Sequence, residues 1–331
     1  MAVGFLMGTE WAGVTPIALA ADASARRYFR LGRDDGHTAV LMDAPPTDGQ
    51  TVAPFISIAE LLREYGLSAP KIYAQDLEHG FVLLEDLGDA VFSTEIASDP
   101  ALELPLYAAA VDVLGELHKQ PLAKDVPVFT ADVMGDMIAP AYDWYRWAIT
   151  GERADDRRRH AELAITETLT GFAKKSLSLR DYHVENMIWL PDRTDVARVG
   201  LLDFQDAMIG PAGYDLASLL MDARRDVPGE IVSEMITRFA AATGLDRADV
   251  ALSVSALSVQ RNLRILGVFA RLALKFGKPR YLDFLPRVWR YVQVGLTHPD
   301  LEQIAGQIAS DMPEPTPQVI RDLANRCGTH K

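Results

Sequence analysis

Three oxygen-bearing side chains lie along one stretch of the chain at a spacing that phosphoryl transfer could use. Asp181 precedes Asn186 by five residues, and Asp203 follows a short apolar run. Phosphoryl transfer needs a carboxylate that orients the attacking hydroxyl and accepts its proton, together with hard oxygen ligands for Mg²⁺. An Asp, an Asn and a second Asp supply these parts, so the stretch predicts a phosphotransfer site.

A hairpin is expected to position these side chains. The apolar runs 187–190 and 199–204 read as strands, and the turn-forming residues 191–194 separate them. Hairpin geometry would bring the three side chains together at one end. His183 has no second histidine nearby at ligand spacing, which argues against a metal-hydrolase cluster. The chain also lacks the Gly-x4-Gly-Lys-Ser/Thr pattern of P-loop enzymes.

The surrounding elements predict an α+β fold. Residues 38–42 and 81–84 read as strands, and residues 52–65 have helical spacing followed by Gly66. Later patterns predict helices over 104–119, 132–149, 155–173, 214–225, 228–242, 246–275, 281–296 and after Pro317. We therefore expect a small antiparallel-sheet lobe with one helix over residues 1–88, and a large, mostly helical lobe over residues 89–331.

Composition excludes several classes of protein. The 331 residues include 33 Lys and Arg against 46 Asp and Glu, a formal charge of −13, which argues against a nucleic-acid partner. Cys327 is the single cysteine, the N-terminus lacks the pattern of a secretory signal, and Asp112 interrupts the apolar stretch 105–115. We expect a cytoplasmic monomer without a membrane partner.

Longer motifs show a family resemblance. Asp181-Tyr182-His183-x-x-Asn186, Leu202-Asp203-Phe204-Gln205-Asp206 and Gly210-Pro211-x-x-Tyr214-Asp215-Leu216 resemble the aminoglycoside phosphotransferase family. That family has a bilobal, protein-kinase-like fold and includes antibiotic, choline and amino-sugar kinases. The resemblance is strongest to bacterial kinases that phosphorylate the anomeric hydroxyl of N-acetylmuramate and N-acetylglucosamine in cell-wall recycling. It implies a kinase that uses ATP and Mg²⁺.

The resemblance assigns roles to particular residues. Asp181 would be the catalytic base, with Asn186 and Asp203 as the Mg²⁺ ligands. The backbone of Glu85, Asp86 and Leu87 would meet the adenine. His183 and Asp215 would support the catalytic loop. Asp143 and Trp144 are candidate acceptor contacts, because an aromatic ring can stack on a sugar, and the alternative for Trp144 is a place in the buried core.

Two positions depart from the family pattern. Leu179 stands where an orienting histidine is usual, and the strand offers Met42 where protein kinases place a lysine that holds the nucleotide phosphates. We expect Arg26, Arg27 or Arg30, with backbone amides near Ser24, to hold the phosphates instead, because arginine suits bidentate phosphate contact. Without that lysine, Glu60 is expected to lie on the surface.

A basic segment indicates the kind of acceptor. Residues 259–291 carry a formal charge of +7, and their basic side chains are Arg261, Arg264, Arg271, Lys275, Lys278, Arg280, Arg287 and Arg290. A cationic wall suits a carboxylated sugar better than a polycationic aminoglycoside, and we expect Arg261 and Arg264 to meet that carboxylate. The alternatives are that these arginines pair with acidic residues, that the acceptor is an aminoglycoside, choline or homoserine, or that the protein is a nucleotide-binding pseudokinase.

Overall fold

The chain divides into two compact units. The computed structural model describes residues 2–19, 26–46 and 51–330. The first unit comprises Met1–Glu116 and Val184–Ala207, and the second comprises Leu117–His183 and Met208–Lys331. These two units have different boundaries from the two predicted lobes. The predicted lobe boundary at residue 88 stays a prediction.

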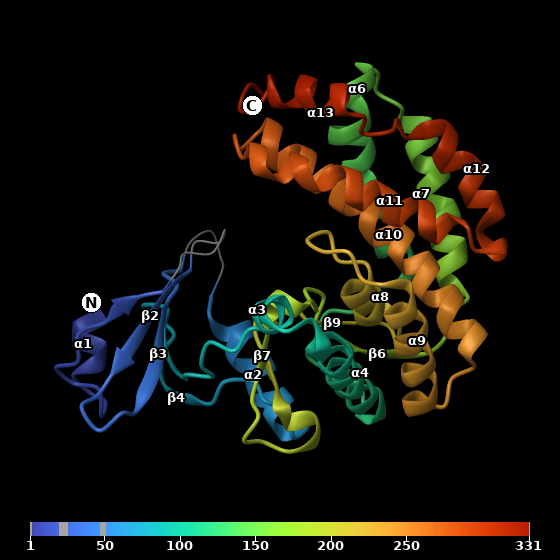
Figure 1. The fold of residues 1–331 in the computed structure, drawn as a ribbon. Helices are drawn as coiled ribbons and strands as arrows, with labels where there is room; N and C mark the ends of the chain where they lie inside the picture. Colours follow the sequence, from blue (N-terminus) through green and yellow to red (C-terminus); the bar gives the residue numbers. More distant parts are fainter. Residues whose placement is uncertain (1, 20–25, 47–50, 331) are drawn as a thin grey trace. The chain divides into compact units, whose positions relative to one another are not determined.

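The first unit is built on a five-stranded antiparallel sheet with the strand order β1-β2-β3-β5-β4. Figure 1 labels β2, β3 and β4 of this sheet. Its strands are β1 (Ile17–Ala18), β2 (Arg27–Gly32), β3 (Thr38–Asp43), β4 (Ile72–Asp76) and β5 (Phe81–Glu85). β3 pairs with β2 on one side and β5 on the other, with Met42 opposite Tyr28 and Val82. The predicted antiparallel sheet and its strands at 38–42 and 81–84 are confirmed.

An N-terminal segment covers one face of this sheet. Leu6 of α1 (Ala2–Leu6) and Trp11 are buried in one cluster with sheet residues such as Leu41 and Leu83. Alternation along the strands explains this packing, because every second side chain points to the same face. The sequence patterns did not predict α1, which is only one turn long.

The predicted helix over residues 52–65 is α2 (Ala53–Glu64). Its buried face includes Phe55, whose ring stacks on Phe204 with 5.0 Å between ring centres. Glu60 is exposed, as expected. Thus α2 contacts the segment that carries Asp203.

A second segment of chain completes the first unit. The strands β7 (Met187–Trp189) and β8 (Val199–Leu201) form the predicted hairpin, preceded by the 3-10 helix η3 (Val184–Asn186) and bridged by η4 (Asp195–Arg198). Ser68 donates its hydroxyl proton to the Ala197 carbonyl at 2.6 Å. The remaining helices of this part are α3 (Phe92–Ser98), η1 (Pro100–Leu102) and most of α4 (Glu103–Lys119).

The second unit is mostly helical. Its helices are α5 (Ala131–Asp136), the π-helix η2 (Ala141–Arg146), α6 (Trp147–Thr150), α7 (Asp155–Thr170), α8 (Tyr214–Leu220), α9 (Gly229–Thr243), α10 (Arg247–Leu274), η5 (Pro279–Phe284), α11 (Leu285–Leu296), η6 (Pro299–Leu301), α12 (Glu302–Asp311) and α13 (Pro317–Ala324). The long helix α10 runs beside α11, and α8 also packs on it (Figure 1). A short sheet of β6 (Lys175–Ser178) and β9 (Met208–Pro211) lies between helical segments of the sequence. In the described part of the chain, no helix is both long and apolar enough to span a membrane.

Two predicted helices differ from the structure. The helix predicted over 132–149 is interrupted by a turn at residues 137–138. This turn lies just before Pro140, which has no amide proton for a helical hydrogen bond. Gly267 of α10 packs against this break, since a Cβ there would lie 1.9 Å from the Pro140 carbonyl carbon. The helix predicted over 214–225 ends at Leu220, where the Asp222 carboxylate accepts the Arg224 amide at 3.1 Å and replaces a helical bond.

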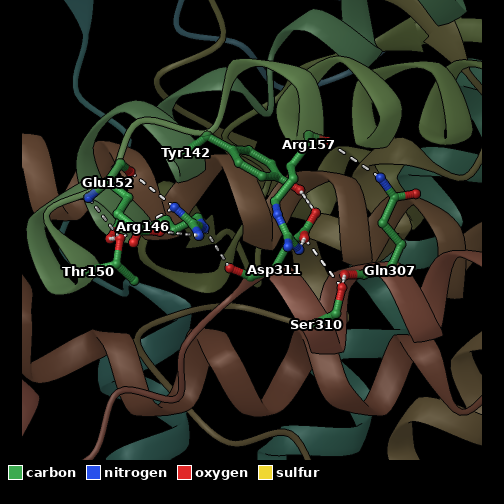
Figure 2. A network of polar contacts seen from close by, with 8 residues as sticks. All are labelled: Tyr142, Arg146, Thr150, Glu152, Arg157, Gln307, Ser310 and Asp311. Atoms are coloured by element: carbon green, nitrogen blue, oxygen red, sulfur yellow. Dashed lines mark hydrogen bonds and ion pairs between the residues drawn. The ribbon is translucent and has the colours of Figure 1, made fainter.

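A buried carboxylate connects three helical segments of the second unit (Figure 2). Asp311 of α12 accepts hydrogen bonds from the Tyr142 hydroxyl at 2.9 Å and from Arg157 Nη1 at 2.8 Å. Its backbone carbonyl accepts a further bond from Arg146 Nε at 3.0 Å. Burial, followed by the charge of Asp311, raises the pKa of Tyr142 well above its usual range, so the phenol remains a donor. The network fixes the π-helix η2 against α12.

Candidate active site

Asp181 lies in the loop that follows β6, here called the Asp181 loop (residues 179–183), and a buried carboxylate holds the start of that loop. Asp215 accepts the Leu179 amide at 2.5 Å and the Arg180 amide at 3.0 Å, each on a different oxygen. Asp215 is 2% exposed, in the first turn of α8. Burial raises its pKa to about 6, against the opposing effect of the two amide bonds. The carboxylate is thus ionised at neutral pH and can accept both bonds.

The carbonyl of Arg180 is held from the other side. Arg261 of α10 donates to it through Nη1 at 3.1 Å, and the Ser218 hydroxyl donates to it at 3.1 Å. Arg261 also donates to Ser218 Oγ at 2.5 Å, and its guanidinium lies 4.6 Å from the centre of the Tyr214 ring. The backbone amide and the backbone carbonyl of Arg180 therefore both have fixed partners.

These bonds stabilise an uncommon backbone conformation. Arg180 has φ +72°, in the left-handed region that residues other than glycine seldom adopt. Such conformations persist only where the surroundings determine them, and they are concentrated at functional sites. The next residue, Asp181, is exposed at the tip of this fixed turn. The arrangement presents one carboxylate to solvent from a rigid backbone.

Two ionisable side chains of the second unit, His183 and Arg264, lie within electrostatic range of Asp181. His183 is buried, and burial followed by the charge of Arg224 lowers the pKa of His183 below its usual range, so its ring is neutral at pH 7. Arg264 lies one turn beyond Arg261 on α10, and burial lowers its pKa. The charge of Asp181 acts in the opposite direction on both groups. Asp181 thus lies within electrostatic range of a neutral imidazole and a half-buried guanidinium.

The two predicted metal ligands lie together in the first unit. Asn186 ends η3 and Asp203 follows β8, and the Leu202 amide donates to the Asn186 carbonyl at 3.0 Å across the open end of the hairpin. Asp203 has φ +56°, and its Oδ1 accepts a bond from Gln205 Nε2 at 2.8 Å. Hairpin pairing therefore brings Asn186 and Asp203 to one place. The predicted grouping with Asp181, in the second unit, stays a prediction.

The chemistry of these two side chains fits Mg²⁺. An amide oxygen and a carboxylate are hard donors, and Mg²⁺ bound at kinase sites takes its other ligands from phosphates and water. Among the described residues, no cluster of three or more His, Cys, Asp or Glu side chains could hold a metal ion. Asn186 and Asp203 would leave further positions around a bound Mg²⁺ to phosphate oxygens and water.

The arginines near the predicted phosphate-covering loop have different partners. Arg26 Nη1 lies 3.8 Å from Asp203 Oδ1, whereas Arg27 Nη2 forms a 2.6 Å ion pair with Asp43. Met42 is completely buried, so the strand offers no polar group at that position. Ser24 lies outside the described residues. Arg26, one of the predicted phosphate contacts, therefore has its guanidinium beside Asp203, a predicted metal ligand.

The acidic side chains at the end of β5 are used within the first unit. Glu85 forms a 2.5 Å ion pair with Arg193, and Asp86 pairs with Arg30 Nε at 2.7 Å. Asp86 also accepts the Gly88 amide at 3.0 Å, which closes a tight turn after Leu87. Because the side chains are occupied, contact with an adenine would use the backbone, and this role stays a prediction.

The predicted acceptor residues Asp143 and Trp144 lie at a different place in the second unit. Both belong to η2 and line a surface hollow of about 510 Å³ with Trp147, Arg153, Thr329 and His330. Asp143 is paired with Arg158 at 3.1 Å, and Trp144 is half-buried. Their contact with an acceptor also stays a prediction.

Sequence reasoning missed two residues that hold the Asp181 loop. Ser218 and Tyr214 are both buried on α8 and contact Arg261, which the sequence analysis assigned to the acceptor or to an ion pair. Their spacing offered a signal, since Tyr214, Asp215 and Ser218 follow the helical i, i+1, i+4 pattern. Their contact with Arg261 on α10 could not be predicted from local spacing, because Arg261 lies 43 residues beyond Ser218 in the chain.

Comparison with known proteins gives the class to which this geometry belongs. The model of the phosphotransferase enzyme family matches residues 15–252. The solved structure of a choline/ethanolamine kinase family protein from Mesorhizobium loti has a TM-score of 0.65 at 15% identity and covers 93% of this chain and 98% of that one. The chain therefore belongs to the phosphotransferase enzyme family, with the kinase-like α+β fold that the motifs predicted.

Two relatives narrow the resemblance. The chain is 35% identical to the N-acetylmuramate/N-acetylglucosamine kinase of Caulobacter vibrioides, over 91% of this chain and 93% of the relative. It is 32% identical to the protein of the same name from Pseudomonas aeruginosa, over 92% of this chain and 91% of that relative. The predicted similarity to this group of kinases is confirmed.

Proposed function

We propose that this protein is an ATP-dependent kinase that phosphorylates the anomeric hydroxyl of N-acetylmuramate or N-acetylglucosamine. The observation that carries the proposal is the Asp181 loop, in which Asp215 and Arg261 fix the Arg180 peptide and expose the Asp181 carboxylate. Its similarity to kinases named for these two sugars, over about nine-tenths of the chain, supports this choice of acceptor.

In the proposed reaction, Asp181 orients the sugar hydroxyl and accepts its proton. The sugar oxygen forms a bond to the γ-phosphorus of ATP, while the bond between that phosphorus and the bridging oxygen breaks and ADP leaves. Catalysis of this kind rests on positioning, because an oriented reactant avoids most of the entropic barrier. The hydrogen bonds to Arg180 supply that positioning from the protein side.

Asn186 and Asp203 are the residues proposed to hold Mg²⁺. When bound, this ion would neutralise the charge of the nucleotide phosphates. Arg26, 3.8 Å from Asp203, is proposed to contact the phosphates in place of the absent lysine. Arg27, with Ser24, is a weaker candidate, since Arg27 is already paired with Asp43. The backbone of residues 85–87 is proposed to bind the adenine.

The proposed enzyme acts on soluble small molecules, and we place it in the cytoplasm as a monomer.

A panel assay tests the function directly. ADP release by the wild-type protein is measured with N-acetylmuramate, N-acetylglucosamine, kanamycin, choline and homoserine, with Asp181→Asn as the inactive control. Turnover of one or both amino sugars is expected.

The other outcomes would each reject the proposal in a distinct way. Turnover confined to kanamycin, choline or homoserine would retain the chemistry of Asp181 and replace the acceptor. ATP binding without turnover of any compound would identify a pseudokinase.

A further inference from the structure

The basic residues of the segment 259–291 have different kinds of partner. Arg287 and Arg290 of α11 both pair with Asp226, so they serve an internal ion pair. Arg261 is used by the Asp181 loop, through the Arg180 carbonyl and Ser218. These three arginines are occupied within the second unit, and they leave the segment with fewer cations for a ligand than its composition indicated.

Arg264 differs from them. It lies three residues beyond Arg261 on α10 and therefore on the same side of the helix. Arg264 is half-buried, yet no residue in the described part of the chain forms a hydrogen bond or an ion pair with its guanidinium. Arg180 and Arg261 act on it as like charges, whereas Tyr214 and Asp181 act in the opposite direction.

An unpaired, half-buried guanidinium is unfavourable for folding, because burial removes water without supplying a counter-charge. The protein nevertheless keeps this group next to the loop that carries Asp181. A fixed cation near the proposed base is suited to an anionic group on a bound molecule. A guanidinium is planar and binds carboxylates and phosphates through two parallel hydrogen bonds.

We infer that Arg264 binds the carboxylate of the acceptor and thereby distinguishes N-acetylmuramate from N-acetylglucosamine. The two sugars differ by a lactyl group, whose carboxylate only the first possesses. Arg261 is instead a positioning residue, because its guanidinium is already bound to the loop. This inference rests on the proposed function, since it assumes that the amino sugars are acceptors.

The experiment compares three single variants on α10 with the wild-type protein. Arg264→Gln removes the charge and keeps a polar side chain, and Arg261→Gln removes the positioning contact. Arg271→Gln is the matched control, because Arg271 is exposed on the same helix. For each protein, kcat and KM are measured with both sugars and with ATP, and the thermal midpoint is recorded.

Arg264→Gln is expected to raise KM for N-acetylmuramate about 10- to 100-fold, the range of a lost charge-assisted bond, and to leave N-acetylglucosamine within about twofold. Its thermal midpoint should equal or exceed that of the wild type, since an unpaired buried charge is removed. Arg261→Gln should lower kcat equally for both sugars, and Arg271→Gln should change neither.

Several results would overturn the inference. Equal losses for both sugars in Arg264→Gln, together with a raised KM for ATP, would assign Arg264 to the transferred phosphate. Equal losses with a lowered thermal midpoint would assign it to the fold. If the wild type phosphorylates neither sugar, the proposed function fails first, which separates that failure from the failure of Arg264 alone. Arg264→Lys keeps the charge and should recover part of the preference, and unchanged discrimination in both variants would also refute the inference.

Discussion

Replacing Asp215 by Asn removes one of the two acceptors that fix the Asp181 loop. The wild-type carboxylate accepts the Leu179 amide on Oδ2 and the Arg180 amide on Oδ1. In the variant, the side chain has one oxygen and one NH₂ group, so one of these backbone amides must face a donor. The shape and volume of the side chain are otherwise preserved, which makes the substitution a test of hydrogen bonding alone.

The size of the effect follows from the lost acceptor. Leaving a buried N–H without a partner costs about 1–3 kcal/mol. If this cost appears as displacement of Asp181 in the transition state, kcat falls about 5- to 150-fold. KM for the sugar and for ATP should change little, because Asp215 is not expected to contact either. Asp192→Asn, an exposed acid in the hairpin turn, serves as the matched control.

The pH dependence supplies an independent measurement. Burial raises the pKa of Asp215 from 3.8 to about 6, so the carboxyl group favours its protonated form in the folded protein. Its contribution to stability is therefore greatest below pH 3.8 and is lost as pH rises through about 6. Between pH 5 and pH 7, the free energy of unfolding of wild type minus that of Asp215→Asn should fall by about 1.4 kcal/mol.

The assay combines urea unfolding at both pH values with initial rates of ADP release from pH 5 to pH 8. Wild-type kcat should also decline below pH 6, where protonation of Asp215 removes an acceptor, and the variant should lack this transition. A variant with kcat within twofold of the wild type and an identical pH profile would refute the argument that Asp215 positions Asp181.

Three further predictions concern other carboxylates. Asp181→Asn should lower kcat by about 10²–10⁴ and leave ATP affinity unchanged by calorimetry; a rate near that of the wild type would remove Asp181 from the reaction. Asp203→Ala should abolish the strengthening of ATP binding by Mg²⁺, whereas persistence of that strengthening would place the metal elsewhere. Asp311→Ala leaves the buried hydroxyl of Tyr142 without its acceptor and should lower the free energy of unfolding by about 1–3 kcal/mol in urea; unchanged stability would show that the network contributes nothing.

Local patterns predicted most of the regular elements. The helices over 104–119, 228–242 and 246–275 end within one turn of their predicted limits, because apolar spacing and terminal residues such as Gly244 are local signals. Gly244 has φ +70° at the end of α9, a conformation that glycine adopts readily. The site around Asp181, Asn186 and Asp203 was also predicted from a local signal, the types and spacing of these residues.

Long-range contacts could not be predicted in the same way. Arg261 carried a charge that suited an acceptor, and only its position against Arg180, 81 residues away in sequence, showed that its guanidinium is occupied. The break before Pro140 was locally visible, but the packing of Pro140 on Gly267 was not. The N-terminal cover of the sheet depends on Leu6 and Trp11 reaching a cluster of strands that appears only after folding.

The first unit is built from two separate segments of the chain. This affects how the protein can fold during its synthesis. Val184–Ala207 supplies the hairpin that bridges to Ser68 and Val91 and the ring that stacks on Phe55. A ribosome adds about 5–20 residues per second, so these partners emerge several seconds after Glu116. During that interval the buried face of α2 has no Phe204 to cover it. A nascent chain of this protein therefore exposes an apolar surface for longer than its N-terminal sheet alone would suggest, and a fragment that stops at residue 116 would retain that surface permanently.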